Sequence, residues 1–204
     1  MVVGGTRYTL PDSMSKGRLE AFSDGVIAIL ITIMVLELRV PSGADLAALS
    51  PILPVFLTYV LSFVFLGIYW TNHHHMFQVT DRINGKILWA NLHLLFWLSL
   101  VPFVTGWMGE NHFARLPTAV YGGVLLLAAI AYSILVTTIV RHQGSNSRLA
   151  AAVGADVKGK LSIGLYGVAI PLAFVNQWIA DAIYVSVALM CLVPDRRIES
   201  KLDR

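Results

Sequence analysis

Polar and titratable side chains gather at three places in a sequence that is otherwise strongly apolar. The first group is Arg18, Glu20, Ser23 and Asp24, the second is the run Trp70-Thr71-Asn72-His73-His74-His75, and the third is Asn91 with His93. Carboxylate and imidazole groups in such a setting can relay protons or bind a metal ion. The same groups can also form a hydrogen-bonded network that only holds helices together.

The three consecutive histidines limit the metal alternative. Neighbouring residues of a helix point about 100° apart, so His73, His74 and His75 cannot all face one ion. No two histidines of the chain follow the i,i+4 spacing that would place them on one helix face. We therefore favour a structural network, and a proton relay or a metal site stays open as an alternative.

The composition assigns these residues to a membrane. Of the 204 residues, 56% are hydrophobic and 13% are charged, and the mean hydropathy is +0.70. Soluble domains carry about 25% charged residues. A water-soluble globule of this size could not bury so much apolar surface. The single cysteine, Cys191, excludes an internal disulfide, and a pI of about 9.1 reports loop orientation here rather than nucleic-acid binding.

The spacing of charges predicts an all-α integral membrane protein with one six-helix transmembrane domain, 17–195. A crossing helix needs roughly 20 apolar residues. The predicted crossings are 17–38, 49–76, 86–109, 115–141, 158–176 and 178–195, with cytoplasmic segments at 1–16 and 196–204. In this orientation only Arg39 and Arg115, of 15 lysines and arginines, lie outside the cell. That bias is the one expected of cytoplasmic loops.

Depth in the membrane brings the three polar groups together. Asp24 lies about seven residues into the first helix, roughly 10 Å from its inner end. The second helix returns to the inside at Trp70 to His74, and the third leaves from the inside and reaches Asn91 at a similar depth. We expect Arg18, Ser23 and Asp24 to meet Asn91 and one of the histidines, although the sequence does not indicate which one.

The first helix also carries an apolar stripe. Ile29, Thr32, Ile33 and Leu36 follow i, i+3, i+4, i+7 spacing, and Asp24 points about 140° away from Ile29. The stripe either faces lipid or lines an axis shared with other copies, where a hydrophobic constriction can gate a pore by dewetting. Periodicity does not separate these two interpretations.

Four motifs resemble the transmembrane protein 175 family of potassium channels. Residues 18–25 (RLEAFSDG) are similar to its RxxxFSD signature, and residues 70–77 (WTNHHHMF) are similar to its WxxHHxxF pattern. Asn91-Leu92 and the run 101–105 (VPFVT) are similar to its NL and PFxT elements. The motifs occur in the family's order and cover about residues 18–110.

The resemblance implies an assembly and a pore. Prokaryotic members of the family carry one six-helix repeat and form tetramers, so it implies a homotetrameric pore lined by the first helix. Carried over by motif position, Ile29 forms the narrowest hydrophobic layer and Thr32 a hydroxyl layer near which potassium binds transiently. Ile33 and Leu36 line the pore beyond it. The residues implied to form the supporting network are Arg18, Phe22, Ser23, Asp24, Trp70, His73, His74 and Asn91.

The predicted function is a passive potassium-permeable cation channel in the plasma membrane of a prokaryote. It has no TVGYG-type carbonyl filter, no enzymatic activity, no cofactor and no fixed metal site. Its expected partners are further copies of itself, the lipid bilayer and potassium ions, and not nucleic acid. The alternatives are a proton-coupled secondary transporter or a proton-permeable channel using Asp24 and the histidines, and an enzyme or metal carrier built on the histidines.

Overall fold

A computed structural model describes residues 16–144, 147, 149–150 and 157–192, and within them every regular element is a helix. The α-helices are α1 (Lys16–Ile33), α2 (Leu53–Gln78), α3 (Gly85–Ser99), α4 (Val101–Glu110), α5 (Arg115–Gln143), α7 (Val157–Val175) and α8 (Gln177–Leu192). Two 3-10 helices, Met34–Glu37 and Leu46–Ile52, follow α1 and precede α2. The all-helical prediction is therefore confirmed for these residues.

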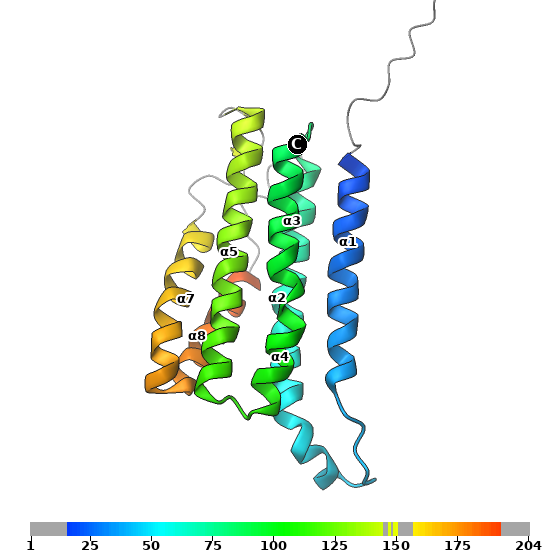
Figure 1. Cartoon of the computed structure of the whole chain (residues 1–204), viewed down its shortest axis with the longest axis vertical. Coiled ribbons are helices and arrows are strands. Elements are labelled where there is room, and N and C mark those ends of the chain that lie inside the picture. Colours follow the sequence, from blue (N-terminus) through cyan, green and yellow to red (C-terminus); the bar gives the residue numbers. More distant parts are fainter. Residues whose placement is uncertain (1–15, 145–146, 148, 151–156, 193–204) are drawn as a thin grey trace, which may run out of the picture.

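The helices run roughly parallel to one long axis, with α5 near the middle and α1 at one edge (Figure 1). Helix α5 packs against α3, α4, α7 and α8, and α1 packs against α2 and α3. The side chains of α1 that this packing buries are Leu19, Ser23, Ile27 and Leu30. They fall on one stripe, so α1 is attached to the bundle through a single face.

Five segments of the described residues are long and apolar enough to cross a membrane. They are Lys16–Glu37, Leu46–Gln78, Gly85–Glu110, Arg115–Gln143 and Val157–Val175. Helix α8 is apolar but has 16 residues, about 24 Å of helix against a hydrocarbon core of about 30 Å. The protein is thus an integral membrane protein, and the sixth crossing stays a prediction. The predicted terminal segments, 1–16 and 196–204, lie outside the described residues apart from Lys16.

The third predicted crossing differs from an unbroken helix. It consists of α3 and α4, which meet at Leu100. Pro102 has no backbone N–H, so it cannot donate to the carbonyl of Leu98 as a continuing helix requires. Just before the proline, the Leu100 amide donates to the carbonyl of Trp97, three residues back, at 3.2 Å. The regular spacing of four residues is present again at Val104, whose amide donates to the carbonyl of Leu100 at 3.1 Å.

Hydroxyl groups join three helices inside the bundle. The Ser62 hydroxyl of α2 lies 2.6 Å from that of Thr105 on α4 and 3.0 Å from that of Tyr121 on α5. All three side chains are buried. Pairing these groups with one another removes the cost of placing polar atoms in an apolar environment.

The two ends of the bundle differ in charge. The Lys16 ammonium donates to the carbonyl of Gln78 at 3.3 Å, which places the start of α1 beside the end of α2. At this end α1 and α3 begin and α5 ends (Figure 1). The cations that the structure describes in these helix ends and in the turn between α2 and α3, here called the basic end, are Lys16, Arg18, Arg82, Lys86 and Arg141. At the opposite end Arg39 pairs with Glu110 at 2.9 Å, both side chains being exposed.

A close approach between α5 and α8 leads to a prediction about packing. A Cβ on Gly122 would overlap the ring of Tyr184, whose side chain is fully buried. Gly122→Ala should therefore destabilise the protein by roughly 1–3 kcal/mol, measured as a lower thermal unfolding temperature in detergent. Gly123→Ala is the matched control, because a Cβ there meets no atom within 4 Å. Equal unfolding temperatures for the two variants would contradict this account of the helix pair.

Candidate functional site

The apolar stripe begins on α1 and ends at Leu36 in the 3-10 helix that follows, and the rest of the described chain leaves it exposed. Ile29 is 59% exposed, Ile33 39% and Leu36 78%, and Thr32 is exposed as well. On the opposite face Ile27 is 1% exposed. One helix therefore presents a packed face to its own chain and a free apolar face to its surroundings.

The Thr32 hydroxyl has a defined orientation on this free face. Its Oγ1 donates back to the helix, with the carbonyl of Ile29 at 2.9 Å and that of Ala28 at 3.0 Å. Because the single hydroxyl hydrogen is used within α1, the oxygen lone pairs are what the side chain offers to a neighbour. These lone pairs can coordinate a cation.

A chain of hydrogen bonds lies on the buried face. The imidazole Nε2 of His73 lies 2.8 Å from Oδ1 of Asn91, and Nδ2 of Asn91 donates to Oγ of Ser23 at 2.9 Å. Ser23 in turn donates to the carbonyl of Leu19 at 2.9 Å. All three side chains are at most 2% exposed. The amide of Asn91 thus joins α1 to α2 and α3 at one point.

Asp24 has a separate partner. The indole N–H of Trp70 donates to its Oδ1 at 3.0 Å, a second link between α1 and α2. The Trp70 ring stacks on His74, with ring centroids 5.8 Å apart, and His74 is bonded to Gln78 at 2.8 Å. This branch is more exposed than the chain through Asn91, since Trp70 is 43% exposed.

The structure brings together only part of the predicted network. Phe22 is 54% exposed. It precedes Ile29 by seven residues and so lies on the same side of α1, on the exposed face and not in the polar network. The reason is helical phase, because Phe22 points about 100° from its neighbour Ser23. Arg18 is also exposed, and among the described residues no hydrogen bond or ion pair joins it to the network.

Sequence reasoning missed two parts of this region. It gave Gln78 no role, although Gln78 accepts from Lys16 at its carbonyl and bonds His74 at its amide. It also did not indicate which histidine meets Asn91, and in the structure this residue is His73. Among the described residues no three histidine, cysteine or acidic side chains gather closely enough to hold a metal ion.

Comparison with known proteins agrees with these features. Residues 18–102 match the sequence profile of the family described as endosomal/lysosomal potassium channel TMEM175. A protein of Chryseobacterium sp. (strain P1-3) named a potassium channel is 56% identical over 93% of this chain and 98% of its own length. This chain belongs to the TMEM175 family. Its relatives are ion channels and not enzymes, so the resemblance noted in the sequence is confirmed.

A solved structure extends the family assignment to the fold. The crystal structure of a lysosomal potassium-selective channel TMEM175 homolog from Chamaesiphon minutus matches with a TM-score of 0.76 and 31% identity. The match covers 87% of this chain and 96% of that one. The human relative, named an endosomal/lysosomal proton channel, is 29% identical over 88% of this chain but only 39% of its own length.

The network suggests a stability test. Asn91→Leu keeps the side-chain volume but leaves the His73 N–H and the Ser23 oxygen without their partner. We expect a loss of roughly 1–3 kcal/mol for each buried group left unpaired, seen as a lower unfolding temperature in detergent. Ser99→Ala on the same helix is the control, since its exposed hydroxyl bonds only the carbonyl of Phe96. If Asn91→Leu has the same unfolding temperature as the parent and the control, the network does not stabilise the position of α1.

Proposed function

We propose that this protein is a passive potassium-permeable cation channel in the plasma membrane of a prokaryote. Four copies surround a shared axis, and α1 of each copy turns its free face toward it. The observation that carries the proposal is the pairing of two faces on one helix. Ile29, Thr32, Ile33 and Leu36 are exposed in the described chain, while Ser23 on the other side accepts a hydrogen bond from Asn91.

The arrangement in the membrane is part of the same proposal. Six crossings place both termini on one side, and the basic end of the bundle faces the cytoplasm. The five described cations of that end support this orientation. The relative named a potassium channel, matched over nearly its whole length, supports the choice of ion.

Conduction follows from the chemistry of the stripe. Four isoleucine side chains at Ile29 form a constriction that a hydrated ion does not pass while the segment is dry. A small displacement of α1 lets water enter this constriction. Above it, the Thr32 oxygens replace part of the hydration shell of the ion, because their hydrogens already point back into α1. The network on the other face keeps α1 upright.

The direct test is flux from purified protein in liposomes under opposed potassium and sodium gradients. Ile29→Ala should raise potassium flux several-fold and reduce discrimination against sodium, because the constriction widens and wets more readily. Ile179→Ala is the matched control, because Ile179 is also an exposed isoleucine (44%) but lies on α8, away from the stripe. This variant should leave flux unchanged. Flux from Ile29→Ala equal to that of the parent would place the constriction elsewhere.

Thr32 tests the hydroxyl layer. Thr32→Val has the same shape but lacks the oxygen, so the ratio of potassium to sodium flux should fall with little change in protein stability, since the residue is exposed. Thr32→Ser restores the oxygen and should restore the ratio. A Thr32→Val channel that keeps the parent's ratio would show that selectivity arises at other residues.

Proton permeation is the second candidate, and the name of the human relative favours it. It would use the network side of α1, where Asp24 meets Trp70 and His73 meets Asn91. A pH-sensitive dye enclosed in the same liposomes separates the candidates. Acidification without an accompanying potassium flux would replace the potassium proposal by this one.

A further inference from the structure

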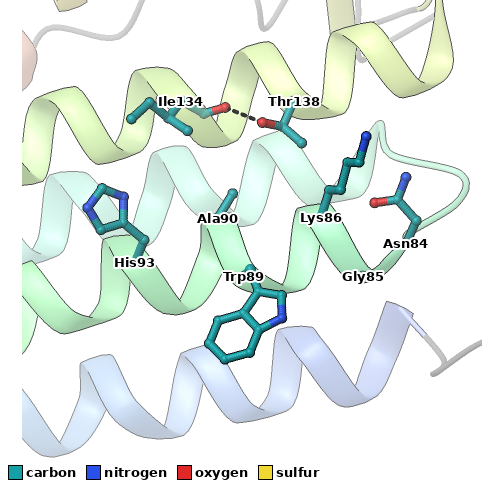
Figure 2. A pocket seen from close by; sticks show the side chains of 8 residues that line it. All are labelled: Asn84, Gly85, Lys86, Trp89, Ala90, His93, Ile134 and Thr138. Carbon is teal, nitrogen blue, oxygen red and sulfur yellow. Dashed lines mark hydrogen bonds between the residues drawn. The ribbon is translucent and has the colours of Figure 1, made fainter.

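A groove runs along the outside of the bundle between α3 and α5, at the basic end (Figure 2). Its volume is about 800 Å³. The lining that matters here comprises Asn84, Lys86, Trp89 and His93 from α3 and its cap, and Ile134 and Thr138 from α5. None of these residues belongs to the α1 stripe or to the network around Asn91.

The mouth of the groove offers hydrogen-bond donors. Asn84 caps α3, since its Oδ1 accepts from the amide of Ile87 at 3.0 Å, and its Nδ2 lies 3.0 Å from Nδ1 of His142. The oxygen and one amide hydrogen are thus used, and one hydrogen remains. Lys86 has no hydrogen-bond or ion-pair partner in the part of the chain that the structure describes, so its ammonium is also available.

A further donor lies deeper. The indole N–H of Trp97 bonds Nε2 of His93 at 2.9 Å. An indole nitrogen can only donate, so Nε2 is the acceptor of this imidazole and its hydrogen is on Nδ1. His93 follows Lys86 by seven residues, about 10 Å along the helix. Figure 2 shows the His93 ring on the side of α3 that faces α5.

The remaining lining is apolar apart from Thr138, and no lining residue carries a carboxylate. Trp89 is 75% exposed and Ile134 is 42% exposed, and both are lining residues of the groove. The Thr138 hydroxyl donates to the carbonyl of Ile134 at 2.7 Å, so it adds no donor. The nearest acid in sequence, Asp81, lies in the turn before α3 and outside the lining. A ligand matching this surface has an anionic head and an apolar tail.

We propose that the groove binds one anionic phospholipid of the leaflet next to the basic end. The phosphate contacts the Lys86 ammonium and the Asn84 amide, and an ester carbonyl accepts from Nδ1 of His93. The first part of an acyl chain lies against Trp89 and Ile134. Basic pockets between transmembrane helices are known to bind lipid headgroups, and tryptophan favours this depth of the bilayer.

The test uses the full-length protein in detergent with added lipid. Native mass spectrometry should show several-fold more bound phosphatidylglycerol than phosphatidylcholine with the same acyl chains, and phosphatidylglycerol should raise the unfolding temperature more. Lys86→Gln should lose this preference. Lys160→Gln removes an exposed lysine from the first turn of α7, outside the groove lining, so this matched control should keep the preference. Thr138→Leu places a larger side chain in the groove lining and removes a hydrogen bond that lies within α5, so it should reduce binding of both lipids.

Each other outcome decides against the proposal. Equal losses in the Lys86 and Lys160 variants would show that general surface charge attracts the lipid. Inorganic phosphate that stabilises the protein as strongly as phosphatidylglycerol would make this a site for a free anion. A map of the assembled protein with side chains of a second copy in the groove would make it a subunit contact. None of these outcomes bears on whether α1 lines a potassium pathway.

Discussion

The position of α1 depends on the side-chain amide of Asn91. It is the one group in the described network that bonds both His73 of α2 and Ser23 of α1. A buried polar group in an apolar setting costs free energy unless it is paired, so these three side chains favour one arrangement of three helices over others that pack equally well by shape. Hydrophobic contacts alone would tolerate a rotation of α1, whereas this chain of bonds does not.

The two faces of α1 therefore have different roles. The side held by Asn91, supplemented by the bond from Trp70 to Asp24, sets the rotation of α1 about its own axis. That rotation decides which residues point outward, and the outward residues include Ile29 and Thr32. The polar side chains therefore act on the proposed pathway without touching it, by fixing the orientation of what does.

The sequence predicts the class of fold and the meeting of the polar groups well, because both follow from composition and depth in the membrane. It could not choose among the histidines, since His73 and His74 differ by about 100° and an uncertainty of one residue at the helix end exchanges them. The effect of a proline on a helix is equally hard to predict from sequence. Pro102 coincides with a break between α3 and α4, whereas Pro171 stands inside α7 without ending it. Local sequence does not tell these cases apart, because neighbouring helices can compensate for the missing donor.

The single-sided attachment of α1 has a consequence for how such a protein can vary. The inner face of α1 is bound by packing and hydrogen bonds, so most changes at Leu19, Ser23 or Ile27 lower the stability of the whole subunit. The outer face meets no such constraint from the described residues of its own chain. Mutations on the outer face therefore change its contacts with other molecules more than they change whether the chain folds. Related proteins can thus diverge in the character of this surface while keeping one scaffold.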